Sequence, residues 1–276
     1  AYDGASVLSG NLTGLQTRVK EISPEAMFVH CCAHNLNLCL IDSADCCVNS
    51  KLFFGTLETL YTFVTSSLPR LKVLGAEQQN ELQKTILTLK RLSDTRGASR
   101  KRAVESVVSS FPAICKALRR IARGDLINCT GAALAEAKGL LATVTTFEFI
   151  FLLCFWNKVL NLVFRLSNYL QGSKIDLITA THLINACCLE LSELRDEQEF
   201  SSIERDAKQL AQKAGAETKY TCKRIRRVKR FYDERVADES LTDMREKFKV
   251  ETFFCLVDTF SSKSVTDLPI LGSILA

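Results

Sequence analysis

The chain has 276 residues, of which 47% are hydrophobic and 24% are charged, and its formal net charge is +5. This composition excludes wholesale disorder, because disordered chains lack the apolar residues needed to bury a core. The modest positive charge permits contact with nucleic acid without requiring it.

The first forty residues alternate between helical and strand-like patterns. Leu8, Leu12, Leu15 and Val19 recur at spacings of three and four, which predicts one helix that Ser23-Pro24 ends. Residues 26–32 form a short apolar run, which favours a strand buried on both faces. Residues 35–43 are again helical in pattern. We therefore expect a small α/β unit at the start of the chain.

The rest of the chain has helical periodicity. Apolar stripes predict helices over 52–66, 70–92, 132–170, 173–199, 203–214 and 248–260. We expect Pro69 to break the first of these and Gly75 to interrupt the second. The apolar run 149–156 is too short to span a membrane, which needs about 20 residues, so it predicts a buried central helix.

Twelve cysteines lie mostly inside these apolar patterns, and we expect no signal peptide. Such cysteines behave as small hydrophobic residues, and we expect them to be reduced in a nuclear or cytosolic compartment.

Two clusters of cations interrupt the apolar patterns. The first begins at Arg96 and the second covers residues 219–230. Each cluster suits either a solvated surface or a surface that follows nucleic-acid phosphates, and the second also suits a nuclear import signal. The candidate nucleic-acid-binding residues are Arg96, Arg100, Lys101, Arg102, Arg119, Arg120, Lys223, Arg224, Arg226, Arg227, Lys229 and Arg230.

Several separated motifs resemble the catalytic domain of the hAT superfamily of DNA transposases, including domesticated relatives such as the zinc finger MYM-type and THAP-domain proteins. The motifs lie at residues 1–10, 14–16, 29–38, 89–96, 146–149 and 250–253. The resemblance implies a mainly α protein, in which a partial ribonuclease H-like α/β core carries a large all-α insertion domain. It also implies a core at 1–95, a helical insertion at 96–245 and a return helix at 246–276.

The resemblance further implies which catalytic residues are left. Asp3 matches the second of three metal-binding carboxylates, and Cys31 with His34 matches the Cys-x-x-His motif beside them. The other two carboxylates are expected outside the chain, which resembles a fragment truncated at both ends. Gly97 stands where the family has a tryptophan. One carboxylate is too few for the two Mg²⁺ ions of the ancestral enzyme, so we expect no enzyme activity and no cofactor.

Two other chemistries fit the Cys and His residues near His34 poorly. A zinc site needs four convergent ligands, and the nearest second pair, Cys46-Cys47, is adjacent in sequence and badly directed. A Cys31–His34 nucleophile pair lacks an orienting third residue and an oxyanion donor set.

We therefore expect a catalytically inactive, transposase-derived nuclear protein that associates weakly and non-specifically with DNA or with chromatin proteins, and with no membrane. A homodimer is expected only if a C-terminal dimerisation region exists. The alternative is a helical scaffold for protein–protein interaction with no DNA binding.

Overall fold

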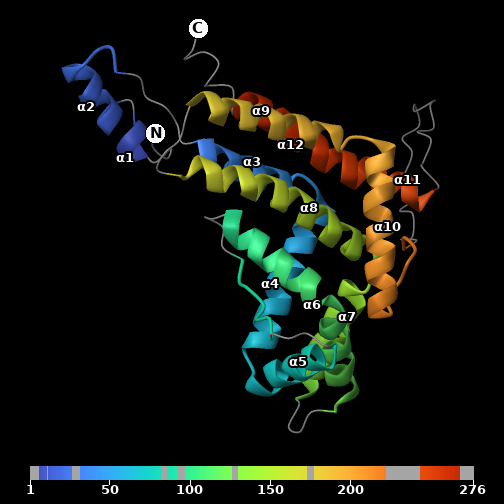
Figure 1. The fold of residues 1–276 in the computed structure, drawn as a ribbon. Helices are drawn as coiled ribbons and strands as arrows, with labels where there is room; N and C mark the ends of the chain where they lie inside the picture. The colour runs from blue at the N-terminus through green and yellow to red at the C-terminus, as the bar shows by residue number, and fades with distance from the viewer. Residues whose placement is uncertain are drawn as a thin grey trace, which may run out of the picture.

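Helices make up all the regular structure in the described part of the chain (Figure 1). The structure is a computed structural model, and it describes residues 6–10, 12–26, 32–81, 86–92, 97–125, 130–172, 177–221 and 243–267. The elements are α1 (Ser6–Ser9), α2 (Leu15–Ile22), α3 (Cys32–Asp45), α4 (Val48–Thr65), α5 (Leu68–Asn80), α6 (Gly97–Arg123), α7 (Gly131–Val144), α8 (Phe147–Leu170), α9 (Leu177–Glu193), α10 (Glu197–Ala214), α11 (Met244–Phe248), the π-helical segment η1 (Lys249–Phe254) and α12 (Cys255–Asp267).

The prediction of a mainly α protein is confirmed. The finer prediction of an α/β core is not supported, because the residues described here contain no strand. Most of the predicted strand, residues 27–31, lies outside the described residues. At its C-terminal end, Cys32 begins α3 instead.

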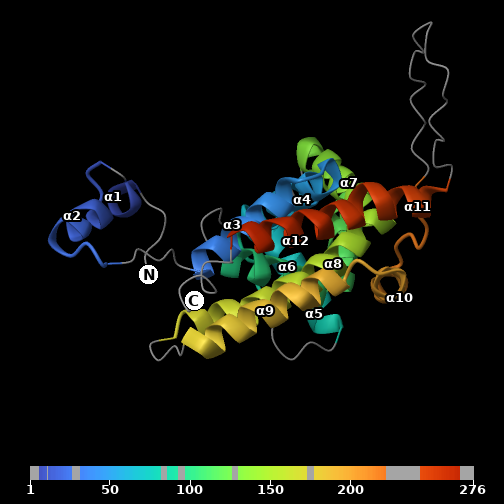
Figure 2. The same cartoon turned by 90° about the horizontal axis from the view of Figure 1, so that it is seen from above.

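Helix α8 runs through the middle of the helical body, as the apolar run 149–156 predicts (Figures 1 and 2). It packs against α3, α4, α6, α7, α9 and α10. The ring centre of Phe151 lies 4.9 Å from the ring centre of Phe200 and 5.2 Å from that of Phe248. A helix that is apolar nearly all round needs such partners on several sides.

By length and composition alone, α8 could also cross a membrane. However, 61% of its most apolar 18-residue window is buried inside the protein, as in the core helix of a soluble protein.

The start of the chain departs from the predicted single helix. Two short helices, α1 and α2, flank a turn in which the Gly14 N–H donates to the Gly10 carbonyl. A Cβ atom on Gly14 would lie only 2.4 Å from that oxygen, so the turn needs glycine there. Leu12 consequently lies in the turn with 90% of its surface exposed. Helix α2 ends before Ser23-Pro24, as predicted.

Of the two predicted breaks in this region, the one near Pro69 is present, since α4 ends at Thr65 and α5 begins at Leu68. Pro69 lies in the first turn of α5, where its missing N–H needs no partner. Helix α5 then continues through Gly75, and residues 86–92 are not helical. Helix α10 ends at Gly215, whose φ of 58° is left-handed, as the sequence predicts.

One buried cluster joins all three predicted segments. It contains Leu40 and Leu57 from residues 1–95, Phe111 and Trp156 from 96–245, and Phe253 from 246–276. The division into a core, an insertion and a return helix stays a prediction.

Candidate binding site between α3, α6 and α8

Of the three predicted catalytic residues, one lies in the described part of the chain. Asp3 and Cys31 lie outside the described residues. His34 lies in the first turn of α3, half-buried, and lines a hollow that α3 forms with α6 and α8.

This hollow has a volume of about 400 Å³, within the roughly 300–1,000 Å³ typical of ligand sites. Its lining residues are Ala33, His34, Leu36, Asn37, Leu40, Ala98, Arg102, Leu160, Val163, Phe164, Ser167, Asn168 and Gln171. The base is apolar, and Leu36, Leu160 and Val163 in it are buried. Among the described residues that line it, none is acidic. The hollow therefore suits a ligand with an apolar body and an anionic or acceptor-rich end.

Hydrogen-bonding groups lie along the same hollow. Arg102 is exposed, and the Oδ1 atom of Asn37 is buried without a hydrogen-bond partner among the described residues. An unpaired buried acceptor of this kind costs about 1–3 kcal/mol. Of these two groups, the exposed guanidinium of Arg102 is the one that a ligand in the hollow can reach.

Sequence reasoning identified His34 and Arg102 but missed the α8 side of the hollow. The signal was present: after Phe164 the exposed and half-buried positions of α8 turn polar, with Ser167, Asn168 and Gln171 at helical spacing.

The cations of α6 form contacts with the protein itself. The Arg100 guanidinium lies 4.9 Å from the ring centre of Phe54, and the Lys101 ammonium lies 4.7 Å from that of Phe164. Lys101 also pairs with Glu105 at 2.8 Å, and its side chain is only 16% exposed. These two side chains therefore help to cover the core.

The cations in the second half of α6 also bond other groups of the protein. Arg119 donates to the carbonyl oxygens of Ala214 and Gly215, at 2.8 and 2.6 Å, and so caps the C-terminus of α10. Arg120 pairs with Glu77 at 2.7 Å, and Lys116 pairs with Glu81. These bonds attach α6 to α5 and α10.

The other predicted nucleic-acid-binding residues divide into two groups. Arg102, together with Arg123 at the end of α6, is exposed. Arg96 and the cations of the second cluster (Lys223, Arg224, Arg226, Arg227, Lys229 and Arg230) lie outside the described residues.

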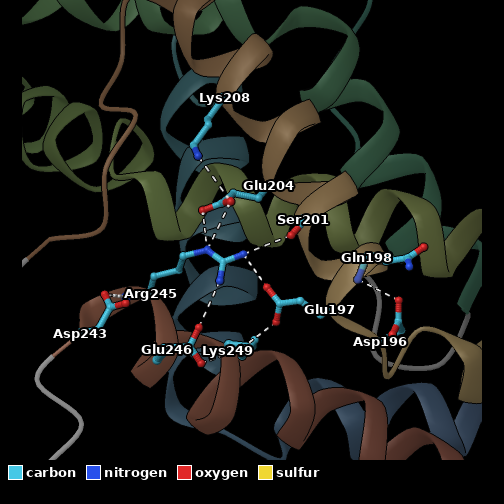
Figure 3. A network of polar contacts seen from close by, with 10 residues as sticks. All are labelled: Asp196, Glu197, Gln198, Ser201, Glu204, Lys208, Asp243, Arg245, Glu246 and Lys249. Carbon is cyan, nitrogen blue, oxygen red and sulfur yellow. Dashed lines mark hydrogen bonds and ion pairs between the residues drawn. The ribbon is translucent and has the colours of Figure 1, made fainter.

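A third group of charges joins the last helices to α10 (Figure 3). The Arg245 guanidinium bonds Glu197 at 2.8 Å, Glu246 at 3.1 Å and Glu204 at 3.4 Å. Lys249 pairs with Glu197 at 2.7 Å and with Glu246 at 2.6 Å. Hydrogen bonds from Lys249 and Arg245 lower the pKa of the Glu197 carboxyl. These charges satisfy one another, and the network serves the fold.

The cysteine side chains that are described are free thiols. Burial raises the pKa of Cys154 and of Cys187 to about 12, so these thiols stay protonated, as predicted for core cysteines. Within the described residues, no group of three or more His, Cys, Asp and Glu side chains could hold a metal ion.

In comparisons with known proteins, no family model and no solved structure matches this chain. In the part of the chain that the structure describes, the protein is helical, and the hollow between α3, α6 and α8 combines an apolar base with cationic and amide groups.

Proposed function

We propose that this protein is a helical interaction scaffold without enzyme activity, and that the hollow between α3, α6 and α8 binds a short segment of a partner protein. The observation that carries the proposal is the pairing of a buried apolar base with Arg102 and His34 in a hollow without acidic lining residues. The segment that fits combines an acidic side chain with an aliphatic or aromatic one.

A role in binding nucleic acid is the second candidate. Its support is the cation cluster at residues 219–230 and the exposure of Arg102 and Arg123. It ranks second because Lys101, Arg119 and Arg120 already bond protein groups. A phosphate would have to compete with those partners.

Descent from a hAT transposase, with a remnant of its ribonuclease H-like core and a nuclear location, belongs to the same proposal. Its support is the order of the motifs between residues 1 and 253. Loss of catalysis is supported in this proposal by Gly97, which stands in place of the family's aromatic residue.

Selection of a random peptide display library on the immobilised chain tests the scaffold role. We expect enriched peptides that contain an acidic residue close to an aliphatic or aromatic one. Arg102→Glu should weaken their binding about tenfold or more, because it places a like charge beside the acidic side chain. The matched change Arg123→Glu, on the same helix but outside the hollow, should leave binding unchanged.

Equal effects of Arg102→Glu and Arg123→Glu would contradict the proposal. Mobility shifts with random duplex DNA distinguish the second candidate. A duplex shift at low salt that weakens with salt at a slope of about −0.9 per phosphate contact would support nucleic-acid binding instead.

A further inference from the structure

Three cysteines meet where the corner between α3 and α4 touches α12. Cys46 and Cys47 form the corner, and Cys255 is the first residue of α12. Helix α12 lies along α3, which Figure 2 shows from above. The thiol of Cys255 donates to the sulfur of Cys46 across 3.6 Å.

The contact between these thiols is set by the surrounding fold. The Asn49 side-chain amide donates to Thr252 Oγ1 at 2.7 Å, and Lys263 pairs with Asp42 at 2.9 Å. The first contact joins η1 to α4 and the second joins α12 to α3, one on either side of the thiols. All three cysteines are only partly buried, so a small oxidant can reach them.

Cys47 provides a thiolate beside the pair. A hydrogen bond from Cys46 lowers the pKa of Cys47 and is the largest influence on it. Burial opposes this effect, and backbone N–H groups of Ser50 and Asn49 at the start of α4 lower the pKa further. The same hydrogen bond to Cys47 raises the pKa of Cys46. Of the two neighbours, Cys47 is therefore the first to lose its proton.

We propose that Cys46 and Cys255 form a reversible disulfide when a peroxide oxidises the protein, and that the bond locks α12 onto the corner between α3 and α4. The thiolate of Cys47 attacks one peroxide oxygen, the O–O bond breaks, and the released hydroxide takes the proton of Cys46 and becomes water. The sulfur of Cys46 attacks the resulting sulfenic acid on Cys47, an S–S bond forms, and the hydroxide that leaves takes the proton of Cys255 as a second water. The sulfur of Cys255 then attacks Cys46, the bond between Cys46 and Cys255 forms, and Cys47 leaves as the thiolate.

The geometry makes this reaction accessible. The two sulfur atoms must approach from 3.6 Å to a bond of about 2.05 Å, which side-chain rotation and a small shift of α12 can provide. The bond would join residues 209 positions apart. Closing so long a loop restricts the unfolded chain, so the oxidised protein should melt at a higher temperature.

Treatment of the whole chain with hydrogen peroxide, followed by thiol blocking and mass spectrometry without reduction, tests the proposal. We expect one linked pair of peptides, containing Cys46 and Cys255, that a dithiol reductant releases. Cys46→Ala and Cys255→Ala should each abolish the link. Cys188→Ala, at a half-buried cysteine that also follows another cysteine directly, should leave it intact.

Cys47→Ala removes the thiolate from beside the pair. We expect the same link to form about tenfold more slowly, because the chain then lacks the sulfur that attacks the peroxide. A link that persists in Cys46→Ala would make Cys47 the partner and overturn the proposal. Sulfinic acid on Cys47 without any link would overturn it too.

A second test uses the unoxidised native chain and needs no variant. Dibromobimane, a reagent that joins two neighbouring thiols, reports whether the thiols of Cys46 and Cys255 are adjacent. We expect a bridged peptide pair that contains Cys46 and Cys255. Failure to bridge these two thiols in the folded chain would show that they are not adjacent and would refute the proposal.

Discussion

Single charged side chains in this protein are placed where they attach one helix to another. The Arg245 guanidinium lies among the carboxylates of Glu197, Glu204 and Glu246 and 4.8 Å from the ring centre of Phe200. Glu204 is buried and also pairs with Lys208, one turn along α10. The two cations on Glu204 therefore offer a matched comparison.

We expect Arg245→Met to destabilise the protein by about 1–3 kcal/mol, because it leaves the buried carboxylate of Glu204 with fewer partners while it keeps an apolar stem. Lys208→Met removes a half-exposed cation within the same helix, at 3.4 Å from Glu204, while Arg245 remains on that carboxylate, so it should cost about 0.5 kcal/mol or less. Urea unfolding followed by circular dichroism measures both. Equal effects of the two substitutions would show that the network in Figure 3 does not hold α11 in place.

The thiol of Cys47 should react at lower pH than an ordinary thiol. Its pKa is lowered to about 7, so the reactive thiolate predominates above that pH and is lost as the pH falls through it. We expect the rate of iodoacetamide modification of Cys47 to be half-maximal near pH 7. Cys154, whose pKa burial raises to about 12, should stay unmodified in the same range. Half-maximal modification of Cys47 near pH 9 would contradict this assignment.

Among the elements, α8 determines the arrangement of the others. Its central aromatic residues pack against the helices on either side. The single ring of Phe151, for example, contacts the rings of Phe200, Phe248 and Phe253. These rings belong to α10, α11 and η1. A change at Phe151 should therefore loosen the attachment of the last helices to the core.

We expect Phe151→Ala to lower the free energy of unfolding by about 3–5 kcal/mol, through lost burial and the cavity left behind. Leu189→Ala, at a leucine of α9 that is 60% exposed, should change it by about 0.5 kcal/mol or less. Denaturant unfolding measures both. A cost at Phe151 as small as that at Leu189 would argue against α8 as the centre of the core.

The sequence predicts elements well where local signals decide them. The apolar run 149–156 and the glycine after α10 are such signals, because the run lies inside α8 and Gly215 ends α10. The predicted helix 132–170 is instead two helices, α7 and α8, and α10 begins at Glu197 rather than at residue 203. Gly75 was misleading inside α5, because packing outweighs its low helix propensity. The early leucine spacing was also misleading, because the turn at Gly10 and Gly14 interrupts it.

Contacts between residues far apart in the chain could not be predicted from the sequence. Arg120 pairs with Glu77, 43 positions away, and Cys46 meets Cys255, 209 positions away. A cluster of basic residues in a sequence does not reveal such partners. The cations of α6 therefore appeared available to nucleic acid, although several of them bond other groups of the protein. His34 and Arg102 were identifiable singly, but only the packing of three helices brings them to one hollow.

At the scale of the whole molecule, most of the cationic side chains described on α6 contact other parts of the protein, and the proposed partner segment would bind in the hollow between α3, α6 and α8. Ser167 lies in that hollow on α8, where its hydroxyl accepts a hydrogen bond from the Gln171 side chain at 2.8 Å. An indole at this position would fill the space that a partner's apolar side chain needs. Ser192, exposed at the end of α9, offers the same substitution away from the hollow.

Calorimetric titration of a display-selected peptide into the Ser167→Trp and Ser192→Trp chains tests the binding scaffold most directly, once circular dichroism shows that both variants are folded. We expect Ser167→Trp to raise the Kd about tenfold or more, which corresponds to about 1.4 kcal/mol or more of lost binding, and Ser192→Trp to leave it unchanged. A Kd that Ser167→Trp leaves unchanged would show that the peptide binds elsewhere and would contradict the proposed function.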